Sequence, residues 1–229
     1  MSAEAKLIAS GRDADIYEAG PGLVVRRSRD GRSLAYEAKI MDYVRSQGFP
    51  VPAVDDISGD GTELVMERLD GVSMLDGVVQ RPWRLLGTGA LLADLHKRLH
   101  RIAAPEWLPA APSGTGDRVV HLDLHPLNVM MTAGGPFVID WANAARGDPH
   151  VDVALTWLLL AAGTVPGSPV AARFVAIGRS AVLHGFLDGC DRVAAAGCLD
   201  EVAAWKSRDA NISCGERAAM ERVVSVHHC

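Results

Sequence analysis

The sequence predicts an α+β protein in which a small β-rich lobe precedes a larger, mainly helical lobe. Strand-like runs separated by glycine and proline turns fill residues 6–67. Long patterns with the 3.6-residue helical period dominate after residue 71. Between residues 119 and 140, a second group of short apolar runs carries a dense set of polar side chains. We therefore expect two lobes, residues 1–68 and residues 69–229.

The small lobe is expected to be a sheet with one helix. A helix is predicted over 33–47, where Glu37, Met41 and Val44 share one face and Gly48 follows the end. Turn residues separate the expected strands, which cover 6–10, 16–19, 23–27, 54–57 and 62–67.

The large lobe shows several helical patterns. Residues 83–104 repeat leucine at helical spacing, which is typical of an amphipathic helix. Asp148 is expected to cap a helix that begins at Pro149 and ends near residue 162. Asp152 is expected to accept hydrogen bonds from loop N–H groups. Further helices are predicted over 168–187, 189–206 and 213–226.

Composition excludes several kinds of partner. A net charge of −5 argues against a nucleic-acid partner, because such proteins normally carry a basic stripe. The longest apolar run, 153–163, is too short to cross a bilayer, so we expect a buried helix there and no membrane partner. The N-terminal residues show no signal-peptide pattern. The 4 cysteines lack paired spacing, which favours a reduced cytoplasmic protein over a zinc site.

The polar residues gather in His121-Leu-Asp-Leu-His-Pro-Leu-Asn128 and, after a hairpin, in Phe137-Val-Ile-Asp140-Trp141. Asn128 directly precedes the first hairpin strand and Asp140 directly follows the second. These positions meet at the open end of a hairpin, where paired backbones lie ~5 Å apart. Carboxylate and amide oxygens suit Mg²⁺, so one ion could contact both side chains. Asp123 is left to accept a proton from a substrate hydroxyl.

These segments resemble the catalytic and metal-binding loops of the protein-kinase-like fold. HLDLHPLNVM is similar to H-G-D-x-H-x-x-N, and IDWANAARGDPHVDVA is similar to I-D-W…G-D-P-x-x-D-[LV]-A. Both patterns belong to the small-molecule branch, the aminoglycoside phosphotransferase and choline kinase relatives. Protein kinases would instead show D-F-G at this aspartate and a later A-P-E, whereas here Trp141-Ala142 follows Asp140 and no A-P-E comes after it. The resemblance runs from about residue 7 to 160 and implies a two-lobed kinase-like fold with a cleft between the lobes.

The resemblance also implies roles for the motif residues. Asp123 is expected to be the catalytic base, and Asn128 and Asp140 are expected to hold the metal. His121 is expected to brace the loop through hydrogen bonds. For His125 two interpretations stay open, a place near the transferring phosphate or a hydrogen bond within the loop.

A kinase-like fold requires a cation near the α- and β-phosphates. Leu23-Val-Val-Arg26 aligns with the V-A-I-K strand, with arginine where lysine is usual. Arg27, which would point to the other face, is the competing assignment. Glu37 is a carboxylate on an apolar helix face and needs a buried partner, for which Arg26 is the expected choice.

Two further nucleotide contacts are expected. Gly11, in the turn between the first two strands, is expected to offer its backbone N–H to phosphate. Glu67 to Leu69 are expected to bond the adenine through their backbone, an assignment that follows from position alone.

The leading prediction is an ATP- or GTP-dependent phosphotransferase that uses Mg²⁺ and acts on a hydroxyl of a small molecule. The acceptor could be an aminoglycoside, another amino alcohol or a sugar. One alternative is a metal-dependent hydrolase with His121, Asp123, His125 and Asp140 as ligands. Another is a nucleotide-binding pseudokinase, which the arginine at position 26 keeps open. The sequence leaves the oligomeric state unknown.

Overall fold

The computed structural model describes residues 6–11, 13–81, 83, 85–162, 169–209 and 212–227. Backbone packing divides the chain into two compact units. The first comprises Met1–Val72 and Val129–Ala142, and the second comprises Ser73–Asn128 and Asn143–Cys229. The sequence predicts functional lobes at residues 1–68 and 69–229, and these boundaries stay a prediction. The packing units differ from them chiefly in placing residues 129–142 with the N-terminal part of the chain.

An antiparallel sheet with the strand order β1-β2-β3-β5-β4 forms the centre of the first unit. Its strands lie where the sequence predicts them, with β2 longer than expected at both ends. They are β1 (Leu7–Ser10), β2 (Ala14–Gly20), β3 (Leu23–Ser28), β4 (Val54–Ile57) and β5 (Glu63–Glu67). In the register, Arg26 pairs with Leu64, and Leu23 pairs with Glu67 at the end of β5.

One helix, α1 (Ala35–Ser46), buries Glu37, Met41 and Val44 on a single face, as predicted. The helix ends because Gly48 adopts a φ of 79°, in the left-handed region that favours glycine. The N–H of Phe49 then donates to the carbonyl of Val44 at 3.0 Å, which satisfies a terminal helix carbonyl.

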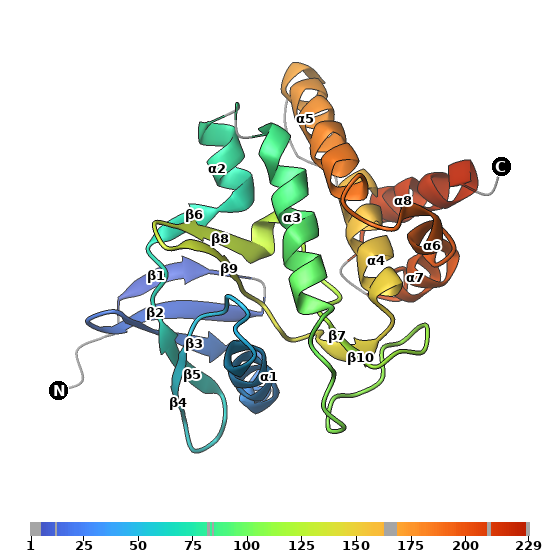
Figure 1. Ribbon diagram of the computed structural model, residues 1–229. Helices are drawn as coiled ribbons and strands as arrows, with labels where there is room; N and C mark the ends of the chain where they lie inside the picture. The colour runs from blue at the N-terminus through green and yellow to red at the C-terminus, as the bar shows by residue number, and fades with distance from the viewer. Residues whose placement is uncertain are drawn as a thin grey trace. The chain divides into compact units, whose positions relative to one another are not determined.

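A second sheet of the first unit brings together segments that are distant in sequence. It has the order β6-β8-β9, with β6 at Gly71–Ser73, β8 at Val129–Thr132 and β9 at Gly135–Val138 (Figure 1). Gly71 is required here, because a Cβ would lie 2.3 Å from the carbonyl oxygen of Met131. The predicted hairpin is confirmed, with Val129 opposite Val138. Trp141 follows it and packs edge-on against Phe49, with ring centroids 5.7 Å apart.

The second unit is mainly helical and is arranged around α4 (Pro149–Ala162), which packs against β7, α5, α6, α7 and α8. Helix α4 is buried on nearly every side, which confirms the predicted buried helix. Asp148 caps it by accepting a hydrogen bond from the N–H of His150 at 2.8 Å. The other elements are α2 (Met74–Gln80), α3 (Leu85–Leu99), β7 (Arg118–Val120), the 3-10 helix η2 (Pro126–Asn128), β10 (Ala145–Gly147), α5 (Pro169–Leu187), α6 (Arg192–Ala196), α7 (Leu199–Lys206) and α8 (Cys214–His227).

Some predicted boundaries are wrong. The helix expected over 189–206 is divided into α6 and α7, because Asp191 caps α6 through the N–H of Ala194 and Gly197 ends it. The first of the apolar runs between residues 119 and 140 is a strand only as far as Val120, and Leu122 beyond it has a φ of 59°. The helix expected over 83–104 ends at Leu99. Elements β6, α2, η2 and β10 are not foreseen in the sequence. No helix in the described residues has the length and apolar character needed to cross a membrane.

Candidate active site

The loop after β7 holds the predicted base, Asp123, in the second unit. Just before it, Leu122 adopts a left-handed backbone conformation, with a φ of 59°, that costs an L-residue roughly 1–2 kcal/mol. Two hydrogen bonds fix this conformation. Asp152 on α4 accepts from the N–H of His121 at 3.0 Å through Oδ2 and from the N–H of Leu122 at 2.8 Å through Oδ1. The predicted role of Asp152 is therefore confirmed.

Asp152 has no exposed surface and is stabilised in its charged form. His100 Nε2 lies 3.0 Å from its Oδ2. Burial alone would raise the pKa of Asp152. The hydrogen bond from His100, the charges of His96 and His100, and the N–H of His121 outweigh burial and hold that pKa below its usual range. The loop is thus anchored to a buried carboxylate.

Asn128 is bonded directly to Asp123. Its Nδ2 donates to the Asp123 carbonyl oxygen at 2.9 Å and to the carboxylate Oδ2 at 3.1 Å. Both amide protons are therefore directed at Asp123, which orients the amide oxygen of Asn128 away from it. An amide oxygen held in this way is a suitable ligand for Mg²⁺.

His125 lies within the same loop and next to the Asp123 carboxylate. Its Nδ1 accepts from the N–H of Leu127 at 3.3 Å, so a neutral ring carries its proton on Nε2. That Nε2 is 3.7 Å from Asp123 Oδ2. The structure shows the hydrogen bond within the loop, which is one of the two interpretations of His125.

A second cluster lies in the first unit, where Arg26 stands between two carboxylates. Arg26 Nη2 is 3.3 Å from Glu37 Oε1 and 3.3 Å from Asp140 Oδ1. The predicted pairing of Arg26 with Glu37 is therefore present. Burial raises the pKa of Glu37, and the positive charge of Arg26 opposes that shift. The Nε–H of Arg26 is buried and has no hydrogen-bond partner among the described residues.

Arg27, the competing candidate, points elsewhere. Its Nε is 2.7 Å from Glu63 Oε1, its guanidinium lies 4.6 Å from the centre of the Tyr17 ring, and its side chain is 48% exposed. The Arg26 side chain is only 13% exposed. The alternation of side chains along β3 thus directs Arg26, and not Arg27, toward Glu37 and Asp140.

Asp140 is also held in an unusual conformation. Its φ is 66°, and Leu122 and Asp140 are the non-glycine residues with positive φ in the described part of the chain. Such conformations are uncommon outside glycine, and they cluster at functional sites. Both occur at or next to residues that the sequence predicts to be catalytic or metal-binding.

The two expected nucleotide contacts are only partly available. The N–H of Gly11 donates to the Ala14 carbonyl at 2.9 Å and closes the β1–β2 turn, so this N–H is already used. In the connector, the N–H of Glu67 donates to Ala53 at 2.8 Å. The N–H of Arg68 donates to Gly22 at 2.9 Å.

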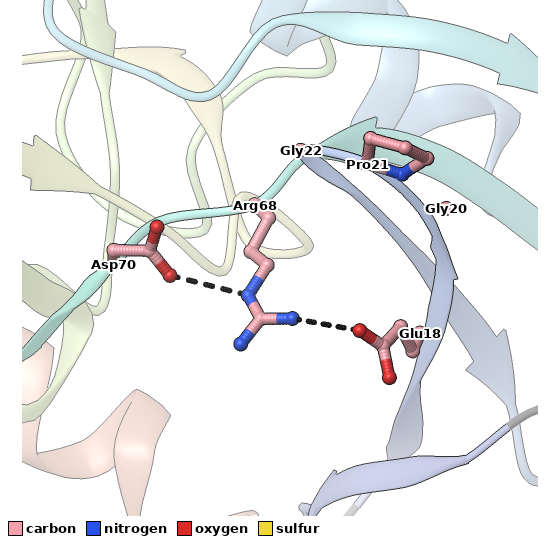
Figure 2. A pocket seen from close by; sticks show the side chains of 6 residues that line it. All are labelled: Glu18, Gly20, Pro21, Gly22, Arg68 and Asp70. Carbon is pink, nitrogen blue, oxygen red and sulfur yellow. Dashed lines mark hydrogen bonds and ion pairs between the residues drawn. The ribbon is translucent and has the colours of Figure 1, made fainter.

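An open pocket of about 500 Å³ lies beside this connector, at the β2–β3 turn (Figure 2). Figure 2 shows Arg68 between Glu18 and Asp70, with its Nη1 and Nε each 3.2 Å from the nearest carboxylate oxygen. Exposed ion pairs of this kind contribute about 0–1 kcal/mol to stability. None of the predicted catalytic or metal-binding residues lines the pocket; its lining residues are Glu18, Gly20, Pro21, Gly22, Arg68 and Asp70.

A zinc-type ligand cluster is not found in the described part of the chain. No three of its His, Cys, Asp or Glu side chains are arranged to share a metal ion. Asp140 carries a carboxylate and Asn128 an amide oxygen, and oxygen donors of both kinds suit Mg²⁺ better than zinc.

The sequence interpretation missed Thr156 and assigned no site role to His96 and His100. Thr156 is buried inside an apolar run, and its Oγ1 donates to the Leu124 carbonyl at 2.8 Å. His96 Nε2 lies 3.0 Å from Thr156 Oγ1. The four-residue spacings of His96 with His100, and of Asp152 with Thr156, are the signal that could have indicated facing pairs.

Comparison with known proteins identifies the family of this chain. The model of the phosphotransferase enzyme family matches residues 4–116 and 105–190. No match was found among curated proteins.

Among solved structures, a choline/ethanolamine kinase family protein from Mesorhizobium loti is 14% identical, with a TM-score of 0.60 over 99% of this chain and 87% of that one. The streptomycin–ATP ternary complex of APH(2")-IIa is 16% identical, with a TM-score of 0.57 over 89% of this chain and 83% of that one. An aminoglycoside-3'-phosphotransferase of type VIII is 19% identical, with a TM-score of 0.57 over 97% and 91% of the two chains. These similarities confirm the kinase-like α+β fold. The family match covers most of the sequence, and the chain therefore belongs to the phosphotransferase enzyme family and is a small-molecule kinase.

Proposed function

We propose that the protein transfers the γ-phosphoryl group of ATP or GTP to a hydroxyl of a small molecule, with Asp123 as the base. The observation that carries this proposal is the bonding of Asn128 to Asp123. Both amide protons of Asn128 are directed at Asp123, at 2.9 Å and 3.1 Å, so the base and a neutral oxygen ligand are held as one rigid pair.

Asp123 acts on the acceptor. Its carboxylate takes the proton of the acceptor hydroxyl as the hydroxyl oxygen forms a bond to the γ-phosphorus. The bond between this phosphorus and the β–γ bridging oxygen breaks, and the nucleoside diphosphate leaves. In-line transfer of this kind depends mainly on positioning and on neutralising charge. His125, 3.7 Å from Asp123 Oδ2, places a donor beside the same carboxylate.

Asp140 and Asn128 are the residues that would hold Mg²⁺, which when bound neutralises the negative charge on the phosphate oxygens. Asp140 contacts Arg26, and Arg26 also contacts Glu37, each at 3.3 Å. The Arg26 side chain is 13% exposed, and we assign its guanidinium as the cation that contacts the phosphates. Glu37 fixes the guanidinium from the helix side.

The connector supplies the contact to the base of the nucleotide. The N–H groups of Glu67 and Arg68 already donate to Ala53 and Gly22, so we assign the donor role to the N–H of Leu69. The carbonyl of Glu67 is the matching acceptor two residues earlier. Gly11 uses its N–H within the β1–β2 turn, so its contribution to phosphate binding would require the turn to open.

The acceptor is proposed to be an aminoglycoside, another amino alcohol or a sugar. Two of the structural neighbours support this choice by name, a choline/ethanolamine kinase family protein and an enzyme solved with streptomycin and ATP. We place the enzyme in the cytoplasm, where ATP is available and where the unpaired thiols of Cys190, Cys198 and Cys214 would stay reduced.

The test is an ATP-consumption screen of the purified protein against amino alcohols, aminoglycosides, sugars and nucleosides, with Asp123→Asn measured in parallel. We expect acceptor-dependent ADP release from the wild type and none from Asp123→Asn. Stoichiometric zinc that survives purification would instead favour the hydrolase. Nucleotide that binds but is never consumed with any acceptor would favour the pseudokinase.

A further inference from the structure

Two residues of α4, one helical turn apart, hold the backbone on both sides of Asp123. Asp152 accepts the N–H groups of His121 and Leu122, on the N-terminal side. Thr156 donates to the carbonyl of Leu124, on the C-terminal side, at 2.8 Å. Residues four apart on a helix share a face, so a single helix supplies both anchors. Both side chains are buried, at 0% and 1% exposure.

His96 on α3 completes the second anchor, because it decides where the Thr156 hydroxyl proton points. The Leu124 carbonyl can only accept, so the Thr156 hydroxyl donates its single proton to this carbonyl. The lone pair of Thr156 Oγ1 then faces His96 Nε2 at 3.0 Å and needs a proton from that nitrogen. In this arrangement His96 donates to Thr156, and Thr156 donates to Leu124.

The single proton of His96 could instead lie on Nδ1, 2.9 Å from the carbonyl of Leu92. Burial lowers the pKa of His96 to about 4, so at pH 7 the ring is neutral and has one proton to place. The Leu92 carbonyl can also only accept, so a proton on Nε2 leaves the Nδ1 lone pair facing it at 2.9 Å, but this carbonyl is inside α3 and keeps its helical hydrogen bond. The Leu124 carbonyl is outside any helix in a fully buried residue. A proton on Nε2 satisfies Leu124 through Thr156, whereas a proton on Nδ1 draws the Thr156 hydroxyl away from it.

We propose that Thr156 and His96 are positioning residues that hold Asp123 from its C-terminal side, through the relay His96 Nε2–H to Thr156 to the Leu124 carbonyl. This proposal rests on the proposed function, in which Asp123 is the base. Neither residue touches the acceptor or the nucleotide in this role. Together with Asp152, which holds the backbone on the N-terminal side of Asp123, they fix the direction of the Asp123 carboxylate.

The anchor is tested first without reference to catalysis. Thr156→Val keeps the shape and removes the hydroxyl, Thr156→Ser keeps the hydroxyl, and Thr88→Val makes the same change at another buried threonine of the second unit. We expect amide hydrogen exchange of residues 121–128 to be about tenfold faster in Thr156→Val, the change that corresponds to losing one buried hydrogen bond. Thr156→Ser and Thr88→Val should exchange like the wild type in this segment. Equal exchange in Thr156→Val and the wild type would overturn the anchor.

The relay makes a separate prediction for the unaltered protein. The nitrogen chemical shifts of the His96 ring should show the proton on Nε2 at pH 7. A proton on Nδ1 would overturn the part assigned to His96, and this measurement does not depend on any variant folding.

The positioning role is tested by steady-state kinetics with ATP and the best acceptor from the screen. Displacing a catalytic group by about 1 Å can cost on the order of a hundredfold, so we expect kcat of Thr156→Val to fall by roughly ten- to a hundredfold. The KM for ATP should stay within about twofold, and Thr156→Ser should recover most of kcat. Unchanged kcat in Thr156→Val, with an active wild type and an inactive Asp123→Asn, would overturn positioning. An inactive wild type would instead refute the proposed function. Amide hydrogen exchange and the nitrogen chemical shifts of His96 would then still test whether Thr156 and His96 hold the loop.

Discussion

Replacing Asp152 by asparagine keeps the shape of the side chain but removes one of the two oxygens on which the active-site loop depends. In the wild type, Oδ1 accepts from the N–H of Leu122, and Oδ2 accepts from the N–H of His121 and from His100 Nε2. Asparagine presents one oxygen and one NH₂ group. Whichever way the amide is turned, at least one buried N–H then faces another donor.

The expected loss in the free energy of unfolding follows from the number of donors that are left without an acceptor. A buried donor without a partner costs about 1–3 kcal/mol, and hydrogen bonds to a neutral oxygen are weaker than those to a carboxylate. Leu122 would also lose or weaken one of the bonds that fix its left-handed backbone, with a φ of 59°. We therefore expect Asp152→Asn to lower the free energy of unfolding at pH 7 by about 3 kcal/mol. Because the pKa of Asp152 is lowered on folding, the carboxylate stabilises the fold above its unfolded value of about 4, and the difference shrinks as pH falls below it.

Urea unfolding followed by circular dichroism measures this difference, with Asp188→Asn as the control. Asp188 is exposed, so the same chemical change there should alter the free energy of unfolding by no more than about 0.5 kcal/mol. A loss below about 1 kcal/mol in Asp152→Asn would refute the reasoning, because it would mean that the three donors are satisfied without the carboxylate.

Three other predictions concern the chemistry and the buried histidine. Asp123→Ala should lower kcat by about 10²–10⁴-fold and leave the calorimetric affinity for Mg-ATP nearly unchanged; retained turnover would rule out a base at this position. Asp140→Ala should reduce nucleotide affinity in the presence of Mg²⁺ to the value measured without it, and an unaltered Mg²⁺ effect in titration calorimetry would contradict the metal role. Burial lowers the pKa of His96 from 6.5 to about 4. As pH falls, this imidazole is therefore protonated in the unfolded chain before it is protonated in the folded chain. The free energy of unfolding should fall as pH decreases through this window, less steeply in His96→Gln, and urea midpoints at pH 7 and pH 5 measure the slope.

Much of the site could be predicted because its geometry is local or periodic. The two-residue period of a strand placed Arg26 on one face of β3, and helical spacing placed Glu37 on the buried face of α1, which is why their ion pair was expected. The capping role of Asp148 follows from residue type at a helix start, whereas the role of Asp152 is expected together with the family resemblance of the segment that contains it. Apolar runs on either side of a glycine turn predict the hairpin.

The rest depends on distances between segments that sequence patterns do not encode. His100 and Asp152 are 52 residues apart, and His96 and Thr156 are 60 residues apart, so neither pair is visible before the helices are packed. The left-handed backbone of Leu122 is not a preference of leucine but is imposed by bonds to α4. The engagement of Gly11 within its own turn also depends on the register of β1 against β2.

The discontinuous first unit has a consequence for how the protein is made. Residues Met1–Val72 leave the ribosome well before Val129–Ala142, which supply β8, β9 and the ring that packs on Phe49. Domains generally fold as units during synthesis, so this unit has to wait for a segment that follows 56 residues of the other one. Until then β6 has no strand to pair with, and Arg26 and Glu37 face each other without Asp140. The nascent N-terminal part therefore exposes an unpaired strand edge, and the carboxylate proposed to bind metal arrives only when the unit closes.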